Sequence, residues 1–293
     1  MPEQASAHPT SVLLALREIP IVCPLCKQPL SAREQTYCCS PCGKTYPLHA
    51  GIPDFRVFPD PYLAMEEDRE RTEFVLEALE RLDFPSLLEA YWGVSDVTPE
   101  ELRGKFIRSA MLGEKKAMRI LDLLRGKEFD NDSIATHSVL EIGCGTGGFL
   151  ATAMARFQTV VGIDIGMRWL HVSRRRFMDK GLDVPALVCC CAEHLPFPHG
   201  TFDQIVCSAT LEFARDQDRV LSECARTMSV TGSAYFSTVN RFSLAQDPYV
   251  YLWGLGFLPR SWQARYVRYR RGGGAVLGHQ GFSLLSLRAI APG

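Results

Sequence analysis

The sequence predicts an α/β fold in which helices cover both faces of a parallel sheet, with a small cysteine-rich module in front of it. Two observations predict this architecture. From residue 137 on, short apolar runs alternate with helical stretches, a spacing that joins parallel strands by crossover helices. Ahead of residue 58, two Cys-x-x-Cys pairs stand in a segment too short to bury much core.

The composition indicates a globular protein with one mid-sized domain and a smaller appendage. The chain has 293 residues, of which 46% are hydrophobic and 22% charged, as is typical of soluble domains. A net charge of -1 favours neither general nucleic-acid binding nor a strongly acidic partner. The N-terminus lacks a basic region ahead of its short apolar run, and no apolar stretch reaches the roughly 18 residues of a membrane-spanning helix. We therefore expect a cytoplasmic protein without a transmembrane segment.

The eleven cysteines are divided between a cluster at 23–42, a run at 189–191 and three scattered positions. An odd number with this clustering argues against a disulfide framework and for metal ligands plus reduced thiols. In the run at 189–191 neighbouring side chains would alternate between the two faces of a strand. We therefore interpret them as buried small residues rather than as metal ligands.

The first cluster predicts a structural zinc site in a zinc ribbon over residues 17–58. Two Cys-x-x-Cys knuckles supply the four thiolates of a tetrahedral zinc shell, and Cys38 falls outside their spacing. Such a shell leaves no open coordination position, so we expect the zinc ion to stabilise the module rather than to catalyse a reaction. The predicted ligands are Cys23, Cys26, Cys39 and Cys42.

A helical linker or lid is expected over residues 59–128. In residues 65–82 the apolar side chains keep to one face at helical spacing, and oppositely charged residues lie four apart on the other. A second helix is expected over 98–113, and a third from there to about residue 125.

Five strands with helices between them are predicted in residues 129–240. The strand segments are 137–142, 159–164, 185–190, 202–208 and 233–239. The helical segments are 149–157, 167–180 and 216–228.

The central motif follows the first of these strands and reads VLEIGCGTGGFL at 139–150. A strand, a glycine-rich turn and a helix bind nucleotides in many folds, although GxGxxG spacing alone is a weak signal. Glu141 lies two residues before the first glycine, where a carboxylate suits the ammonium group of a methionine moiety and would repel a pyrophosphate. The LPF…FD pattern at 195–203 is one that NAD-binding folds lack. These details predict S-adenosylmethionine (SAM) as the cofactor.

With these motifs in order, residues 137–238 resemble class I SAM-dependent methyltransferases. The resemblance implies a Rossmann-like SAM-binding sheet. Asp164, at the end of the second strand, would accept hydrogen bonds from both ribose hydroxyls. Ile165 would pack on the adenine, Ala192 would donate its backbone N–H to it, and Ser208 would lie near the methionine end. The turn contributes to the cofactor site with Glu141, Gly143, Cys144, Gly145 and Gly147.

Two positions depart from the family's pattern. Cys191 stands where family members usually carry an Asp that contacts the adenine amino group; we keep Cys191 in the predicted cofactor site. The Pro-Gly-Gly that usually precedes the fifth strand is Val230-Thr231-Gly232 here, which predicts a looser or longer turn.

The cysteine module also resembles a known one. Residues 21–55 are similar to the zinc ribbon ahead of some bacterial methyltransferases and to small methyltransferase-activating proteins. In ribosomal-RNA guanine methyltransferases a related module helps to hold RNA. Its fourth ligand there tends to be a His, where this chain has Cys42.

Residues 241–293 are expected to form a C-terminal lid segment. Within it, residues 241–271 combine aromatic side chains with six arginines and a single acid, Asp247. We interpret this span as a lid helix with a solvated basic face. Alternatively, the basic face of this span binds an anionic acceptor, RNA or a membrane surface. The short apolar run at 249–258 would contact that membrane surface.

The sheet is predicted to be incomplete on its C-terminal side. Class I sheets have seven strands, whereas five are expected by residue 239, and FSLLSLRAIAPG at 282–293 looks like a helix cut short. The fifth strand would then be an edge and an aggregation liability. Either the lid span or a partner covers it, or the chain is a truncated form of a longer enzyme.

The leading hypothesis is a SAM-dependent methyltransferase with a small-molecule or carrier-linked acceptor. One alternative is an RNA methyltransferase that grips RNA with the ribbon and the basic span, and another is a degenerate methyltransferase fold that serves as a binding scaffold. Methyl transfer needs a general base only where the acceptor must lose a proton. His194 and Glu212 follow the third and fourth strands, near the expected acceptor, but neither is assigned a catalytic role, and the oligomeric state is open.

Overall fold

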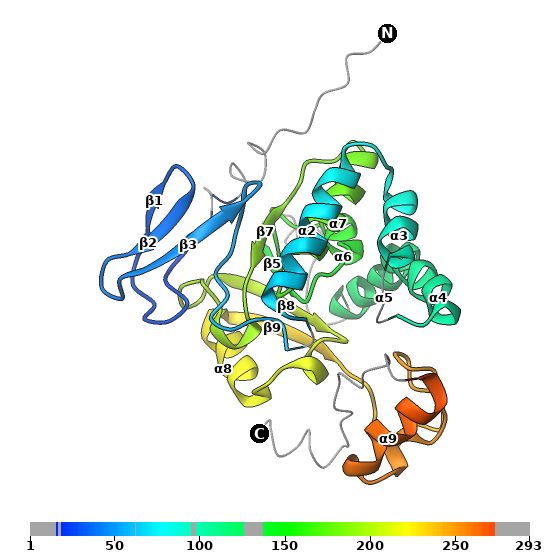
Figure 1. The fold of residues 1–293 in the computed structure, drawn as a ribbon. Helices are drawn as coiled ribbons and strands as arrows, with labels where there is room; N and C mark the ends of the chain where they lie inside the picture. The colour runs from blue at the N-terminus through cyan, green and yellow to red at the C-terminus, as the bar shows by residue number, and fades with distance from the viewer. Residues whose placement is uncertain (1–15, 17–18, 62, 95–97, 126–136, 273–293) are drawn as a thin grey trace.

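The computed structural model describes residue 16 and residues 19–61, 63–94, 98–125 and 137–272. These residues form a five-stranded parallel sheet between helices and a four-stranded antiparallel sheet beside it (Figure 1). The predicted α/β class is confirmed. Among the described residues, no helix is long and apolar enough to cross a membrane.

The parallel sheet contains the five predicted strands. Their order is β7-β6-β5-β8-β9, and all neighbours are parallel. β5, the first of these five strands along the chain, lies in the middle of the sheet, so the direction of winding reverses there. Ligands of open α/β sheets bind at such a reversal, outside the carboxyl ends of the strands. The strands are β5 (Ser138–Ile142), β6 (Thr159–Asp164), β7 (Ala186–Cys189), β8 (Phe202–Ser208) and β9 (Met228–Ser237).

Helices on both faces of the sheet connect the strands and complete its core. Helix α2 packs on α7, and α5 packs on α6. Helix α3 was not expected as a separate helix, although Asp83 caps it by accepting from the backbone N–H of Ser86 at 2.9 Å. The helices are α2 (Met65–Leu79), α3 (Phe84–Gly93), α4 (Glu100–Met111), α5 (Gly113–Arg125), α6 (Gly148–Ala153), α7 (Met167–Asp179), α8 (Gln217–Thr227) and α9 (Arg260–Arg271). The short 3₁₀ turns are η2 (Ala192–His194), η3 (Leu211–Phe213) and η4 (Leu255–Phe257).

The N-terminal module is built on β1 (Ser31–Arg33), β2 (Thr36–Cys39), β3 (Lys44–His49) and β4 (Ile52–Pro53). It covers the β7 edge of the parallel sheet (Figure 1). Asp54 pairs with Cys189 as an added parallel bridge, and the backbone N–H of Phe55 donates to the carbonyl of Cys189 at 2.7 Å. Phe55 is fully buried in a core that the module shares with the sheet. The division of the chain into domains stays a prediction.

The opposite edge of the sheet is β9. Among the described residues β9 pairs only with β8, and Val230 on it is fully exposed. Phe202 faces Met228 but Gln204 faces Ser233, so the strand bulges at the positions where a looser turn was expected. Residues 273–293, where a shortened helix was expected, lie outside the described residues.

A buried ion-pair cluster joins the module to α8. Glu223 is 2% exposed and lies 2.7 Å from Lys27 of the module and 2.8 Å from Arg226. Burial alone would raise the pKa of this carboxyl, but the hydrogen bonds and charges of its two partners lower the pKa to about 2. The ionised carboxylate therefore stabilises the docked module.

We predict that Glu223→Gln lowers the free energy of unfolding by about 1.5–3 kcal/mol at pH 7, because it removes charge-assisted hydrogen bonds at a buried site. Because the pKa of Glu223 is lower in the folded state, its carboxylate stabilises the fold at pH values above its ordinary pKa of 4.5. This stabilisation is lost as the pH falls toward 2. Urea unfolding should therefore show the gap between wild type and variant closing from pH 4.5 downward. Glu73→Gln, at an exposed position, is the control. An equal stability of wild type and Glu223→Gln at pH 7 would contradict this assignment.

Candidate active site

The glycine-rich turn between β5 and α6 has a backbone that favours glycine. Gly143, Gly145 and Gly147 have φ angles of +72°, +48° and +73°, in the left-handed region that other residues rarely adopt. The turn is tied to the neighbouring strand β6 by hydrogen bonds. The backbone N–H of Gly143 donates to the carbonyl of Ile163 at 2.8 Å, and that of Gly145 donates to the carboxylate of Asp164 at 2.9 Å.

The three glycines differ in what a side chain would meet. A Cβ atom on Gly143 would lie 2.1 Å from the hydroxyl of Thr210, and one on Gly147 would lie 2.1 Å from the hydroxyl of Ser173. These two glycines therefore allow close packing inside the protein. A Cβ atom on Gly145 would meet nothing within 4 Å. Gly145 is the position at which the backbone faces open space and a ligand can approach.

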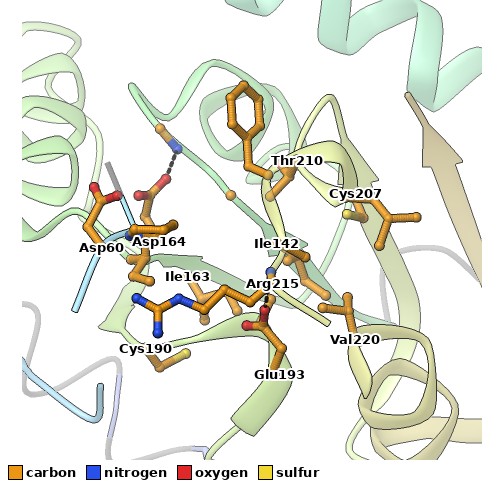
Figure 2. A pocket seen from close by; sticks show the side chains of 18 of the residues that line it. Asp60, Ile142, Ile163, Asp164, Cys190, Glu193, Cys207, Thr210, Arg215 and Val220 are labelled. Atoms are coloured by element: carbon orange, nitrogen blue, oxygen red, sulfur yellow. Dashed lines mark hydrogen bonds between the residues drawn. The ribbon is translucent and has the colours of Figure 1, made fainter. Parts of the chain in front are cut away.

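Beside this turn lies a first cavity of about 320 Å³ (Figure 2). The predicted residues that line it are Gly143, Gly145, Asp164, Ile165 and Ala192. Apolar side chains from the strand ends and from α8 form its floor, which suits a flat ring. These side chains are Ile142, Ile163, Cys190, Cys207 and Val220.

Asp164 is the acidic residue of the first cavity that contacts the glycine-rich turn. Burial raises its pKa to about 6. The backbone N–H groups of Gly166 and Gly145, which donate to it at 2.8 and 2.9 Å, oppose this effect and lower the pKa. Each carboxylate oxygen has two lone pairs and accepts one backbone hydrogen bond. One lone pair on each oxygen therefore remains for a ligand, which fits two neighbouring hydroxyl groups.

A second cavity of about 360 Å³ lies on the other side of the turn. The predicted residues Glu141, Cys144 and Ser208 line it, together with Trp92 and Phe106 from the helical segment. Glu141 is 7% exposed, and its Oε2 atom is buried without a hydrogen-bond partner. Burial and the nearby charge of Asp164 raise the pKa of Glu141 well above its usual value. A buried carboxyl group with one oxygen left unpartnered fits a ligand cation.

Two of the predicted cofactor residues line none of the cavities described here. Gly147 packs against Ser173 on α7. The thiol of Cys191 points to the carbonyl of Phe58 at 3.4 Å, and its neighbour Cys190 lines the first cavity instead. Both residues follow the end of β7, and Cys191, with an extended backbone just before η2, directs its thiol toward the segment that follows the N-terminal module.

Sequence reasoning missed a wall of the first cavity. A strap, defined here as residues 54–61, leaves the module, follows β7 and brings Phe58 and Asp60 to the cavity. The guanidinium of Arg215 lies 4.2 Å from the ring centre of Phe58 and donates to the carbonyl of Pro59 at 3.0 Å. No local motif marks these residues, because their roles depend on where the module docks.

A third cavity of about 770 Å³ lies between the ends of β8 and β9 and residues 239–264. Ala209 lines all three cavities, so they meet at the end of β8. Glu212 lines the third cavity. His194 lines none of the three; its ring lies 6.1 Å from that of Phe58, and burial lowers its pKa.

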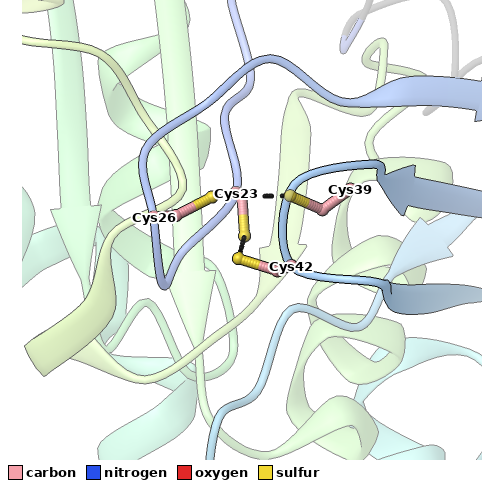
Figure 3. Close-up of side chains that lie close together, drawn as sticks. All are labelled: Cys23, Cys26, Cys39 and Cys42. Atoms are coloured by element: carbon pink, nitrogen blue, oxygen red, sulfur yellow. Dashed lines mark hydrogen bonds between the residues drawn. The ribbon is translucent and has the colours of Figure 1, made fainter.

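The four cysteines of the two knuckles come together in the module (Figure 3). Their sulfur atoms all lie within 4.8 Å of one another, and among the described residues they are the one group placed to hold a metal ion. Cys38 is not part of it and lies 3.7 Å from the hydroxyl of Thr36. The three cysteines of the run at 189–191 are buried, as expected.

The comparisons with known proteins agree with this geometry. Residues 140–236 match the methyltransferase domain family. Ubiquinone biosynthesis O-methyltransferases from Escherichia coli and Shigella boydii are 36% identical to this chain over 104 residues, which are 35% of this chain and 43% of those relatives. The chain thus matches less than half of the length of these curated relatives.

Solved methyltransferases are similar in fold but only weakly. One is phosphoethanolamine N-methyltransferase 2 of Haemonchus contortus in complex with phosphomonomethylethanolamine and S-adenosylhomocysteine, with 20% identity over 60% of this chain and 35% of that one and a TM-score of 0.45. Another is a SAM-dependent methyltransferase of Thermotoga maritima, with 20% identity over 65% and 76% of the two chains and a TM-score of 0.42. Similarities at this level carry no argument about activity.

For the cysteine cluster we predict one zinc ion per chain in freshly purified protein, because four converging thiolates match the preference of zinc. Cys39→Ser should lose the metal, and Cys38→Ser, at the neighbouring position, should keep it. Elemental analysis of both variants measures this. Folded wild-type protein without zinc would rule the site out.

For the methyltransferase domain we predict that Asp164→Ala weakens the binding of S-adenosylhomocysteine by at least tenfold, since hydrogen bonds to a charged group contribute about 1.5–3 kcal/mol. Wild-type affinity should also fall as the pH is lowered through about 6, where Asp164 takes up a proton. Calorimetric titration measures both effects, with Asp183→Ala at an exposed position as control. Unchanged affinity in Asp164→Ala would place the cofactor elsewhere.

Proposed function

We propose that this chain is a SAM-dependent methyltransferase that acts on a small-molecule acceptor. One observation carries the proposal. The open backbone at Gly145 lies near two carboxyl groups: Asp164, which is partly buried and keeps free lone pairs, and Glu141, which is buried and whose Oε2 atom has no hydrogen-bond partner. SAM carries two ribose hydroxyls and a methionyl ammonium group, so these two acids suit opposite ends of the same molecule.

In this proposal each residue has a defined task. Asp164 accepts hydrogen bonds from the ribose hydroxyls, and Glu141 binds the ammonium group. Ile165 and the apolar floor of the first cavity hold the adenine ring, and the strap closes over it through Phe58, against which Arg215 packs. The bound cofactor supplies an electrophilic methyl group on a sulfonium. The chain contributes orientation and the exclusion of water, which accelerate a displacement by fixing the reacting atoms in line.

A small-molecule acceptor is favoured by the names of the curated relatives, which are O-methyltransferases of ubiquinone biosynthesis. The third cavity, at about 770 Å³, also has the size of a small-molecule site. Neither the comparisons nor the described residues supply evidence for RNA methylation or for a scaffold without activity. We further propose that zinc in the four-cysteine cluster is structural and supports the strap.

The proposal predicts that Glu141→Gln lowers the affinity for S-adenosylhomocysteine about tenfold or more, because the amide cannot neutralise the ammonium group. In this variant the affinity should also depend less on pH than in the wild type. The raised pKa of Glu141 makes the cofactor compete with a proton for this carboxyl group. Calorimetry in buffers of different ionisation enthalpy measures that proton. The substitution keeps the size of the side chain, and its fold is checked by thermal unfolding. A folded wild-type protein that binds neither SAM nor S-adenosylhomocysteine would refute the proposed function.

A further inference from the structure

The three cavities meet at a strained backbone position. Ala209 follows β8 and has a φ angle of +54°, which is rare for a residue with a side chain. Its N–H donates to the carbonyl of Ser237 at 2.8 Å, and its carbonyl oxygen lies 3.2 Å from the hydroxyl of Tyr249, whose single proton is directed mainly at Glu212. Backbone strain of this kind is concentrated at functional sites. Ala209 therefore marks a point where the second and third cavities lie side by side.

A hydroxyl–carboxylate pair lies at the same point. Tyr249 donates to Glu212 at 2.8 Å, and Thr238 donates to the other oxygen of Glu212 at 3.0 Å. Glu212 is 1% exposed, and no lysine or arginine among the described residues forms an ion pair with it. Burial and the charge of Glu212 raise the pKa of Tyr249. Tyr249 thus keeps its proton at neutral pH, and Glu212 is the group that can receive one.

The rest of the third cavity is cationic and aromatic. Lys116, Arg241 and Arg260 line it, and none of them pairs with a carboxylate within the described part of the chain. Arg241 donates its Nε to the carbonyl of Gly256 at 3.1 Å, which leaves its terminal nitrogens for a ligand. The two acidic residues that line the third cavity already have hydrogen-bond donors. Two hydroxyl groups donate to Glu212, and backbone N–H groups donate to Asp247. These cations therefore offer the third cavity a place for an anionic group.

The aromatic lining favours a ring-bearing ligand. Phe106 on α4 and Tyr251 line the cavity, with ring centres 6.5 Å apart in an edge-to-face arrangement. Aromatic pairs of this geometry take a further ring as a neighbour. The two side chains come from segments far apart in the sequence, so the C-terminal segment completes the cavity rather than only covering it.

We propose that the third cavity binds an anionic, hydroxyl-bearing aromatic acceptor, whose hydroxyl meets Tyr249 and Glu212 and whose anionic group meets Arg241. This inference rests on the proposed function and names its substrate class. In the reaction the acceptor oxygen forms a bond to the methyl carbon while the carbon–sulfur bond breaks and its electron pair stays on sulfur. The acceptor's proton passes to the oxygen of Tyr249 as the tyrosine proton moves to Glu212. Glu212 afterwards releases its proton to water.

The test uses the full chain with two matched probes, 3,4-dihydroxybenzoate and its uncharged amide. With SAM, the carboxylate should be methylated with a kcat/KM at least tenfold above that of the amide, measured as release of S-adenosylhomocysteine. Arg241→Gln should reduce that ratio toward one. Tyr249→Phe and Glu212→Ala should lower kcat at least tenfold while the affinity for S-adenosylhomocysteine stays unchanged, and formate should restore part of the Glu212→Ala activity. Tyr269→Phe, exposed in the same segment, is the control.

The outcomes separate this inference from the proposed function. Protein that binds S-adenosylhomocysteine but neither binds nor methylates the carboxylate overturns the inference and leaves the proposed function in place, and so does equal activity on both probes. Unchanged kcat in Tyr249→Phe and Glu212→Ala overturns the assigned proton path. Glu212→Ala could also lose activity that formate does not restore and melt at a lower temperature. Glu212 would then only anchor the segment that carries Tyr249, and the assigned proton path would be overturned as well. Protein that does not bind S-adenosylhomocysteine overturns both proposals.

Discussion

The carboxylate of Asp164 holds the nucleotide-binding turn in place. It accepts from Gly145 in the turn and from Gly166 at the start of α7, so one side chain joins three segments at the end of β6. The left-handed turn offers few hydrogen bonds of its own, and a neutral side chain at this position would bind those N–H groups less tightly. The raised pKa of Asp164 shows the cost of burying this charge. The same charge is what a pair of ligand hydroxyls can use.

The strap connects the N-terminal module directly to the first cavity. It extends the sheet at β7, and Arg56 at its centre binds Asp54 and Asp68 and donates to the carbonyl of Ile165 at 3.2 Å. Phe58 and Asp60 follow as part of the cavity wall. The four-cysteine cluster, the strap and the cofactor cavity therefore form one continuous structure. A metal ion held by the four cysteines would therefore act on the cavity wall through the strap, although the cluster itself does not line the cavity.

Local patterns predicted most of the central sheet. Each strand and connecting helix of residues 137–237 lies within a few residues of its expected position, because alternating apolar runs and a glycine turn are local signals. Sequence spacing also predicted that the four cysteines converge. The strap, the placement of Cys191 and the pairing of Tyr249 with Glu212 could not be predicted, because they depend on how segments distant in sequence pack together. Glu212 was noted as a residue near the acceptor, but nothing in the sequence identified its hydroxyl partner.

The structure of the protein with S-adenosylhomocysteine bound tests the central claim most directly. The account predicts both ribose hydroxyls within hydrogen-bonding distance of Asp164, at about 2.5–3.0 Å, the methionyl ammonium group beside Glu141, and the sulfur atom close to Ala209, facing the third cavity. A bound molecule that leaves Glu141 without a partner, or whose sulfur points away from Ala209, would contradict it.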